Sequence, residues 1–395
     1  MQELYTYHDN IMRFVPTAFY RYLYEKIDWQ QRMIAVKGPR GSGKTTLMMQ
    51  YIRTLPQDTV LYITMDHTWF YQHTLFETAE AFYQEGGRTI CIDEVHKYPR
   101  WSTELKNIYD GFPDMQIVLS ASSALDIYRG EADLSRRLVT YTLPGMSFRE
   151  YLNFTNGTDL PVLSLQTLVR DHKKHSVALS RDFHPLPAFR KYLHKGYLPF
   201  TISAKDEVLS MQLVNIINAT IDHDLSFVEG FDPAHGFKVK KLLGILAESA
   251  PFKPNISALA RKMNMARDTV YSYIQHLQKA RLLNLIHATN KGVSALQKPD
   301  KLYLENTLLA YALNQVPDKG TLRETFLLNQ LINSGHAVHL PNSGDFITDD
   351  LIIEVGGKNK GDQQVRSQSK HLLAIDDIEN GMGKRVPLWM FGMLY

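Results

Sequence analysis

The sequence predicts an α/β fold in which a parallel sheet is covered by helices on both faces and is followed by further domains. A short apolar strand at Met33–Val36 runs into a glycine-rich turn, and Thr45–Tyr51 then has the pattern of a helix. Apolar strands and helical segments alternate over the next part of the chain, which is typical of parallel strands joined by crossovers. The chain has 395 residues, too many for one ordinary core, so we expect two or three domains.

The turn after the first strand fits the P-loop pattern G-x-x-x-x-G-K-S/T. Glycines let the backbone turn its N–H groups inward, and the following helix N-terminus adds partial positive charge. Lys44 is expected to reach the β- and γ-phosphates of ATP, and the Thr45 hydroxyl to bind Mg²⁺. An unrelated glycine turn before a helix is the alternative. The predicted nucleotide-binding residues are Gly38, Pro39, Arg40, Gly41, Ser42, Gly43, Lys44, Thr45 and Thr46.

The strand predicted at Thr89–Val95 ends in two acids, Asp93 and Glu94. Asp93 stands where the second nucleotide motif, Walker B, places a Mg²⁺-associated carboxylate, and Glu94 is then positioned to orient and deprotonate the attacking water. Paired acids also begin loops by chance, but the P-loop upstream favours the catalytic interpretation. Aromatic and apolar residues at helical spacing also predict a packing helix over Thr17–Ile27, before the P-loop.

Two further sets of polar residues follow. The strand predicted at Met115–Ser122 ends in hydroxyl residues, and Ser120 or Ser122 could lie between the Walker B aspartate and the γ-phosphate as a sensor of hydrolysis; a solvated serine-rich turn is the alternative. Arg136 and Arg137 precede a fifth strand. A guanidinium offered across a subunit interface would stabilise phosphoryl transfer and would require a homo-oligomer; surface arginines that cap a helix are the alternative.

These motifs occur in a fixed order: GPRGSGKTT, TICIDEVHKYPRW, IVLSASSALDI, LSRRLVTYTL with PGMSFREYL, and KGYLPF. In that order the chain resembles prokaryotic AAA+ ATPases related to the origin-recognition and STAND-type ATPases. It is most similar to bacterial and archaeal ATPases that carry a C-terminal nuclease-like domain. The resemblance covers nearly the whole chain and implies a helical lid from Ser147 to about Phe200. It implies the roles given above for Lys44, Thr45, Asp93, Glu94, Ser120 or Ser122, and Arg137 or Arg136. No sensor-2 arginine can be placed, which leaves a slow switch as an alternative to cooperative hydrolysis.

Positive charge is concentrated in one segment, although the whole chain carries only +3. From Phe237 to Lys291 there are ten Lys/Arg and two acids, so the remainder has 44 − 10 = 34 basic and 41 − 2 = 39 acidic side chains. Such concentration is the electrostatic footprint of a polyanion-binding module. It predicts DNA as a partner.

The same segment has the helix order of a winged helix. Apolar residues from Val239 to Leu246 recur at helical spacing, Asn255 caps a helix over Ile256–Met263, and a longer helix runs over Ala266–Ala280 before an apolar strand. In the longer helix one face is expected in the core and the opposite face in the major groove. The core face consists of Val270, Tyr273, Ile274 and Leu277, and the opposite face of Arg267, Tyr271, Gln275 and Gln278. A winged helix that only packs against other domains is the alternative.

The C-terminal segment has an order of helix, strands, helix and strand that is similar to the PD-(D/E)xK nuclease core, an α/β restriction-endonuclease-like fold. Helices are predicted at Lys301–Leu313 and Leu322–Asn333. The resemblance places Glu324, Asp345, Glu354 and Lys358 at the site, with Gln363 or Gln364 on the next helix, and makes Asp345 and Glu354 ligands of a second Mg²⁺. The residue two after Glu354 is Gly356 and not lysine. This departure favours an inactive fold over an active nuclease.

The remaining features limit the class of protein. The sole cysteine, Cys91, excludes an internal disulfide and indicates a reducing compartment. No apolar run is long enough to cross a membrane, and the N-terminus lacks a signal core, so we expect a cytoplasmic protein with no membrane partner. The predicted domains are 1–200 (AAA+ core and lid), 201–300 (connecting helix and winged helix) and 301–395 (nuclease-like). The predicted function is Mg²⁺-dependent ATP hydrolysis coupled to a conformational change on DNA or a DNA-bound partner. The alternatives are a STAND-like nucleotide switch and an ATP-gated DNA nuclease.

Overall fold

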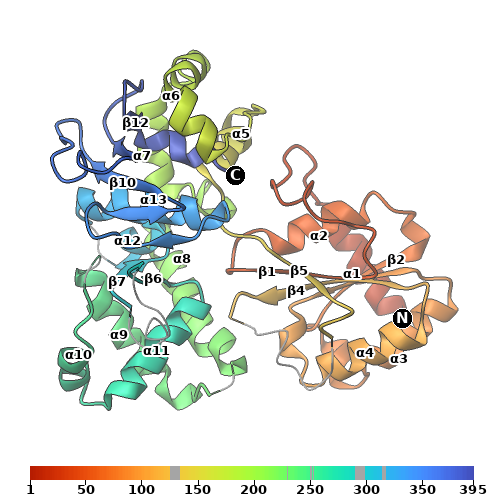
Figure 1. The fold of residues 1–395 in the computed structure, drawn as a ribbon. Helices are drawn as coiled ribbons and strands as arrows, with labels where there is room; N and C mark the ends of the chain where they lie inside the picture. Colours follow the sequence, from red (N-terminus) through yellow and green to blue (C-terminus); the bar gives the residue numbers. More distant parts are fainter. Residues whose placement is uncertain (125–133, 229, 250, 252, 290–298, 314–316) are drawn as a thin grey trace. The chain divides into compact units, whose positions relative to one another are not determined.

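The computed structural model describes residues 1–395 except 125–133, 229, 250, 252, 290–298 and 314–316 (Figure 1). The end of the predicted sensor motif, Leu125–Ile127, and the end of the basic segment, Asn290 and Lys291, lie outside the described residues. The chain forms two compact units. The first contains Met1–Gly145 and His223–Phe231, and the second contains Met146–Asp222 and Asp232–Tyr395.

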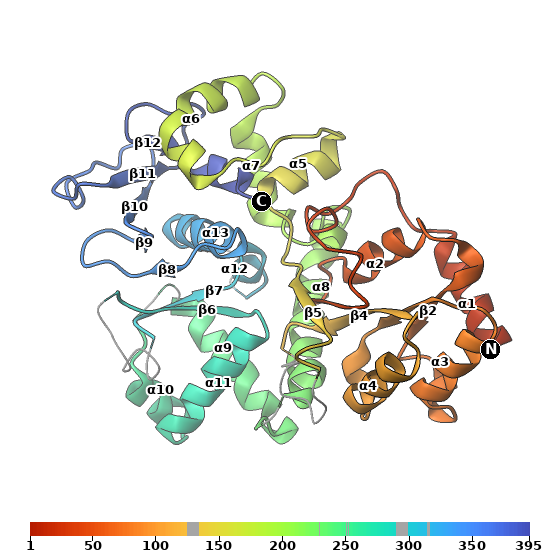
Figure 2. The same cartoon turned by 45° about the vertical axis from the view of Figure 1, so that its right-hand side comes forward.

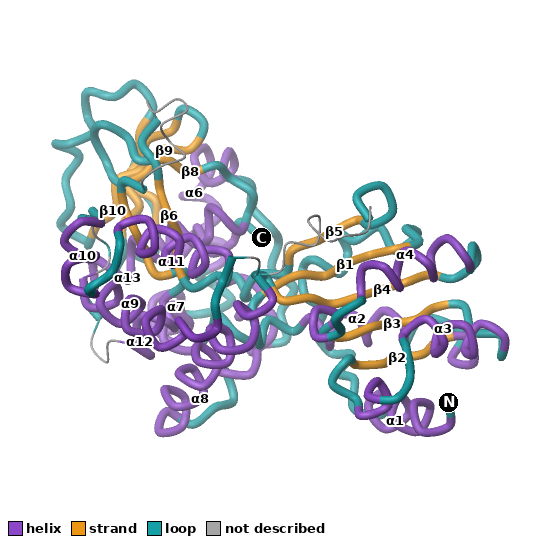
Figure 3. The backbone as a smooth tube through the Cα atoms, turned by 90° about the horizontal axis from the view of Figure 1, so that it is seen from below, coloured by secondary structure: helices purple, strands orange, loops and turns teal. Residues whose placement is uncertain are grey.

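The first unit is built on a five-stranded sheet in which every neighbouring pair is parallel. Its strand order is β2-β3-β4-β1-β5, which can be followed in Figure 3. The strands are β1 (Met33–Gly38), β2 (Val60–Thr64), β3 (Thr89–Asp93), β4 (Gln116–Ser122) and β5 (Val139–Thr142). The predicted parallel sheet is therefore confirmed.

Helices cover both faces of this sheet. They are α1 (Gln2–Met12), α2 (Lys44–Ile52), α3 (Leu75–Gln84) and α4 (Trp101–Gly111). Successive residues of β1 alternate between two apolar clusters, since Ile34 packs with Leu47 of α2 and Ala35 packs in the cluster that includes Phe82 of α3 and Leu105 of α4. Cys91 is buried in the α2 cluster as a small apolar side chain.

The predicted helix over Thr17–Ile27 is wrong, because that segment forms turns while the helix before the sheet is α1. The apolar residues of the segment are buried as expected, for example Leu23 and Ile27. Arg21 holds this segment against the P-loop by donating a hydrogen bond to the carbonyl oxygen of Ser42. It also donates one to the carbonyl oxygen of Pro144 at 2.9 Å. The spacing of the apolar residues in this segment therefore predicted correctly that they are buried, but not that they form a helix.

The second unit begins with a helical region. It contains α5 (Phe148–Asn156), α6 (Leu165–Leu179), α7 (Pro185–Lys195) and α8 (Asp206–Ala219), and continues with α9 (Gly236–Ser249), α10 (Ile256–Met263) and α11 (Arg267–Lys279). The antiparallel strands β6 (Leu283–Ile286) and β7 (Lys301–Leu304) follow, and then α12 (Thr307–Leu313) (Figure 2). The helix predicted at Lys301–Leu313 is wrong over its first residues. Alternating side chains in KLYL pair as a strand with β6, and the helix starts only at Thr307.

The last part of the second unit is a mixed sheet of order β12-β11-β10-β9-β8, packed with α13 (Lys319–Asn333). Its strands are β8 (Val338–His339), β9 (Phe346–Thr348), β10 (Leu351–Gly356), β11 (His371–Ile375) and β12 (Arg385–Pro387). The strands β10, β11 and β12 are parallel, whereas β8, β9 and β10 are antiparallel. The helix predicted to carry Gln363 or Gln364 is absent, since the segment between β10 and β11 forms turns, in a stretch rich in glycine and serine.

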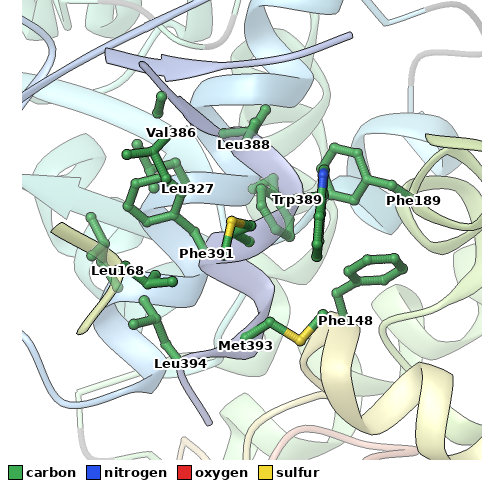
Figure 4. Packing of buried hydrophobic residues seen from close by; sticks show 14 of the residues in the cluster. Phe148, Leu168, Phe189, Leu327, Val386, Leu388, Trp389, Phe391, Met393 and Leu394 are labelled. Atoms are coloured by element: carbon green, nitrogen blue, oxygen red, sulfur yellow. The ribbon is translucent and has the colours of Figure 1, made fainter. Parts of the chain in front are cut away.

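One hydrophobic core joins the start of the second unit to its end (Figure 4). Trp389 and Phe391, in the 3-10 helix Leu388–Met393, pack in one cluster with Phe148 of α5, Leu168 of α6 and Phe189 of α7. Burying each such side chain stabilises the fold by about 1.5–3 kcal/mol. The helices predicted as the lid of the ATPase core therefore share a core with the C-terminal sheet. The boundaries at residues 200 and 300 stay predictions.

Candidate active site

The P-loop connects the carboxyl end of β1 to the amino end of α2, as the sequence predicts. Gly41 and Gly43 have φ angles of 78° and 94°, in the left-handed region that glycine adopts without strain. A Cβ atom on Gly38 would lie 2.2 Å from the carbonyl oxygen of Leu143. Glycine at position 38 is therefore required by close backbone packing.

Lys44 is the first residue of α2 and is only 6% exposed. Its Nζ donates hydrogen bonds to the carbonyl oxygens of Gly38 at 3.0 Å and of Pro39 at 3.2 Å. Burial lowers the pKa of this ammonium, while the charges of Glu94 and Asp93 oppose the shift. The cation is held by neutral carbonyl groups inside the loop, and an anion with stronger acceptor oxygens can displace them.

Asp93 is the centre of a network of hydroxyl groups at the carboxyl end of the sheet. Its Oδ2 accepts hydrogen bonds from Thr45 Oγ1 at 2.7 Å and Tyr62 Oη at 2.8 Å, and its Oδ1 accepts one from Ser120 Oγ. These residues come from α2, β2 and β4, because parallel strands end at the same edge of a sheet. Burial and the nearby Asp93 charge raise the pKa of Tyr62, so the phenol remains a donor. Tyr62 carries no motif and was not predicted.

Glu94 adopts a left-handed backbone conformation, with φ of 53°, which costs a non-glycine residue about 1 kcal/mol. Its N–H donates to Ser120 Oγ at 2.9 Å. Its carboxylate is partly exposed and lies 3.6 Å from His96 Nε2 and 3.7 Å from Lys97 Nζ. The Glu94 carboxylate therefore lies beside His96 and Lys97 and can be reached by solvent.

The two predicted sensor serines lie in different surroundings. Ser120 contacts both Asp93 and the Glu94 amide, as described above. The Ser122 hydroxyl accepts a hydrogen bond from the Ala124 N–H at 3.3 Å, and the Ser122 N–H donates to His96 Nδ1 at 3.4 Å. Of the two, Ser120 has the position expected of a sensor.

Arg136 and Arg137 lie at the opposite end of the sheet from the P-loop. They precede β5, and Val139 at its start pairs with Ile34 near the start of parallel strand β1. The Arg137 guanidinium binds Asp110 with two hydrogen bonds of 2.9 and 3.0 Å and lowers the pKa of that carboxyl group. The structure therefore does not bring these arginines to the P-loop of their own chain, and a role across a subunit interface stays a prediction.

Comparisons with known proteins are consistent with this geometry. Residues 30–152 match the family model described as an AAA domain. This region is therefore similar to AAA domains. Residues 186–320 match a family described as a domain of unknown function (DUF8612). An uncharacterized protein of Methanocaldococcus jannaschii is 27% identical over 396 residues, covering 89% of this chain and 82% of its own.

Two solved structures are also similar. The ORC1 protein of Aeropyrum pernix in complex with DNA is 12% identical, with a TM-score of 0.32, and the match covers 74% of this chain and 88% of that one. AMPPCP-bound DnaA of Aquifex aeolicus is 14% identical, with a TM-score of 0.28, and the match covers 65% and 84%. At these scores neither structure bears on the function of this chain.

The first unit also includes a carboxylate from far along the chain. Asp224 ends a π-helical turn, Thr220–Asp224, and its side chain is 2% exposed. It accepts hydrogen bonds from the P-loop residue Arg40, whose Nε lies 3.1 Å from Oδ1 and 3.0 Å from Oδ2. No motif surrounds Asp224, so the sequence offered no signal for it.

In the second unit, Asp345 and Glu354 lie near each other. Asp345 Oδ2 accepts a hydrogen bond from the Val355 N–H at 2.8 Å. Burial, together with the charges of Glu324 and Glu354, raises the pKa of Asp345 to about 6. Glu354 is 1% exposed, and its carboxylate forms an ion pair with Lys360. The lysine that pairs with Glu354 is thus Lys360, two residues after the predicted Lys358.

The described residues include no group of three or more His, Cys, Asp or Glu side chains arranged to hold a metal ion. Glu324 instead accepts hydrogen bonds from Lys301 at 2.7 Å and Tyr303 at 2.8 Å. Among the described residues no third acidic side chain joins Asp345 and Glu354 as a metal ligand. A second Mg²⁺ at these two acids therefore stays a prediction. None of the described helices is long and apolar enough to span a membrane.

Proposed function

We propose that this chain is a Mg²⁺-dependent ATPase whose hydrolysis of ATP drives a conformational change on DNA or on a DNA-bound partner. The observation that carries the ATPase is the 2.7 Å contact between Thr45 Oγ1 and Asp93 Oδ2, beside the buried Lys44. Both atoms are hard oxygen ligands of the kind that Mg²⁺ prefers. The residues present therefore fit the metal, which supplies charge neutralisation of the β- and γ-phosphates when bound.

Each residue of the site then has its own role in phosphoryl transfer. The loop amides and Lys44 bind the phosphates, with Lys44 exchanging the carbonyl oxygens of Gly38 and Pro39 for phosphate oxygens. Glu94 orients a water and accepts its proton as the water oxygen attacks the γ-phosphorus. The bond from that phosphorus to the bridging oxygen breaks, which releases ADP and inorganic phosphate. Ser120 contacts both acids, so loss of the γ-phosphate reaches β4 through it.

The DNA part of the proposal is supported by the second unit. Helices α9, α10 and α11 with strands β6 and β7 have the element order of a winged helix. In α11 the residues expected in the core are buried, whereas Arg267, Gln275 and Gln278 are exposed. The exposed cations of this region are Lys238, Lys241, Lys253, Arg261, Lys262, Arg267 and Lys279. Arginine and glutamine on an exposed helix face can contact both phosphates and base edges.

An ATPase assay with and without duplex DNA tests this function, and we expect DNA to stimulate turnover with a steep salt dependence. The double variant Arg267→Ala, Lys262→Ala should weaken DNA binding and lower the slope of log affinity against log salt by about 1.8, since each phosphate contact contributes about 0.9. Lys173→Ala, Lys174→Ala removes the same charge from α6 and is the control. Unchanged DNA binding by the first variant would favour a packing role. Tight nucleotide retention with little turnover would favour a switch.

A DNA nuclease is the second candidate, supported by the ion pair between Glu354 and Lys360 beside Asp345. In this arrangement a lysine again accompanies the two acids, although it comes from a later position in the sequence. Mg²⁺-dependent cleavage of DNA that Glu354→Ala abolishes would support this candidate. The free buried Cys91 fits a reducing compartment such as the cytoplasm.

A further inference from the structure

The segment His223–Phe231 belongs to the first unit, although the residues on both sides of it belong to the second. Its contact with the P-loop is the ion pair of Asp224 with Arg40, in which Nε and Nη2 of the guanidinium both bind the carboxylate. The Asp224 side chain is 2% exposed and that of Arg40 26%. A buried carboxylate from this segment is therefore neutralised by a residue of the nucleotide loop.

His96 lies on the other side of the same carboxylate. Its side chain is fully buried, and its Nδ1 accepts the Ser122 N–H, so Nε2 is the nitrogen that carries a proton. That Nε2 lies 3.9 Å from Asp224 Oδ1 and 3.6 Å from Glu94 Oε2, and it makes no hydrogen bond with the described residues. The ring also packs edge-on against Phe227 at 5.2 Å. His96 thus stands between the predicted catalytic base and the segment.

The electrostatics place this cluster within range of the phosphate site. Burial lowers the pKa of Lys44, the charge of Asp224 raises it, and the charge of Arg40 lowers it further. Burial would raise the pKa of Asp224, but the nearby His96 and the hydrogen bonds of Arg40 keep it below its usual value. The Asp224 carboxylate therefore depends on Arg40 for its charge balance.

We propose that Arg40 exchanges between Asp224 and the terminal phosphate of ATP, so that nucleotide binding releases the segment around Asp224 from the P-loop. The inference rests on the proposed ATP-binding function and assigns a regulation to that site. A guanidinium binds carboxylate and phosphate with the same fork of N–H groups, so the two anions compete for it. Without Arg40, Asp224 is a buried carboxylate that has lost its ion pair, which destabilises the docked segment.

The exchange works in both directions. Because coupling between two binding events is reciprocal, the docked segment lowers ATP affinity by the factor by which ATP favours undocking. The segment is continuous at Asp222 and Asp232 with residues of the second unit. Nucleotide state would therefore reach the second unit through Arg40 and Asp224, in a chain where no sensor-2 arginine could be placed.

The decisive experiment measures the affinity of the full chain for AMPPNP with Mg²⁺ by calorimetry. Asp224→Asn keeps the shape of the side chain but removes the charge that competes for Arg40. We expect its affinity to rise about 10-fold, within the range of about 5–150-fold typical of coupled sites. Asp222→Asn, two residues earlier and paired with Lys240 at 2.5 Å, is the matched control and should leave affinity unchanged.

Amide hydrogen exchange over residues 223–228 supplies an independent readout. In the unmodified chain AMPPNP should speed exchange of this segment; in Arg40→Gln exchange should be fast already and independent of nucleotide. An affinity of Asp224→Asn that is unchanged or reduced, or exchange that AMPPNP slows, would overturn the inference. If the unmodified chain binds no AMPPNP at all, it is the proposed function that fails, and Lys44→Ala will then behave like the unmodified chain.

Discussion

The chain has two pairs of acids at strand ends, Asp93–Glu94 in the first unit and Asp345–Glu354 in the second, and their surroundings differ. Asp93 accepts hydrogen bonds from three hydroxyl groups. Asp345 accepts one from a backbone amide and feels the negative charges of Glu324 and Glu354, so that its pKa is raised to about 6. Residues of the same type are thus held by neighbours of different kinds.

The difference shows what makes an acid pair usable. The hydroxyl donors hold the carboxylate oxygens of Asp93 in place beside the P-loop, where they can help to bind a cation. A carboxyl group buried beside other acids favours the protonated form until a cation compensates it. Glu354 forms an ion pair with Lys360, whereas the donors around Asp93 come from the P-loop and two strands. The Asp93–Glu94 pair therefore differs from the Asp345–Glu354 pair in the hydroxyl groups that surround Asp93, and not in the type of acid.

The largest effect is expected for Glu94→Gln. This change keeps the hydrogen-bonding shape but removes the proton acceptor, so turnover of ATP should fall by about 10²–10⁴-fold while AMPPNP affinity stays the same. Steady-state hydrolysis and calorimetry measure the two quantities. Glu80→Gln on α3 is the control. Normal hydrolysis by Glu94→Gln would remove Glu94 as the base and weaken the contrast between the pairs.

Lys44→Ala should lower nucleotide affinity by about 100-fold or more, because it removes a charge-assisted contact to the phosphates. Calorimetry with AMPPNP measures the loss. The exposed Lys174 on α6 provides the control variant, Lys174→Ala. An unchanged affinity would mean that the loop beside Asp93 is no phosphate site.

Asp345→Asn tests the second pair through pH. The folded-state pKa of about 6 lies above the usual 3.8, so ionisation of Asp345 destabilises the fold. Stability is full below about pH 4 and is lost as pH rises through 6, by about 2 kcal/mol after allowance for partial exposure. Asp345→Asn should therefore be more stable than the unmodified chain at pH 7.5 and equal to it at pH 4.

Denaturant unfolding at the two pH values measures this difference, with the exposed neighbour Asp349→Asn as control. A stabilisation of the unmodified chain by Mg²⁺ at pH 7.5 that Asp345→Asn lacks would indicate that the second pair binds a metal. The two pairs would then differ less than their hydrogen bonds suggest.

Tyr62→Phe should have a smaller effect. It removes one of the hydroxyl donors of Asp93 and leaves Thr45 and Ser120, at a cost of about 1–2 kcal/mol in stability. Turnover should fall several-fold as Asp93 becomes less well held. Thermal unfolding and hydrolysis are the measurements, and Tyr71→Phe, at a side chain that is 84% exposed, should change neither. Equal behaviour of both variants would mean that Tyr62 does not support Asp93.

Arg137→Ala should have the smallest effect. Its ion pair with Asp110 is at the surface, where solvent and salt screen the two charges, so its loss should hardly change stability. At low protein concentration turnover per molecule should be unchanged, because Arg137 lies at the far end of the sheet from the P-loop. Turnover that rises with protein concentration in the unmodified chain, but not in the variant, would assign Arg137 to a neighbouring subunit.

Local sequence was sufficient for the parallel sheet, the P-loop and the acids Asp93 and Glu94. Glycine positions, strand periodicity and an acid at a strand end are each features of a few consecutive residues. Each of these patterns determines the structure of those same residues, so it can be recognised without knowing the rest of the fold. It was also sufficient for α11, where Val270, Ile274 and Leu277 are buried as their spacing predicts. It failed at Thr17–Ile27 and between β10 and β11, where tertiary packing and turn residues prevailed over helical spacing.

Only the tertiary structure decided which side chains meet. Arg40 and Asp224 are 184 residues apart in the chain, and Tyr62 reaches Asp93 across 31 residues. The helices α5, α6 and α7 share a core with Trp389 and Phe391 for the same reason. Burial of apolar area stabilises any pair of apolar faces that fit together, however far apart they are in the chain. A periodic pattern predicts which face of an element is apolar, but not which other face it packs against. The donors around Asp93 and the carboxylate behind Arg40 were therefore decided by the fold.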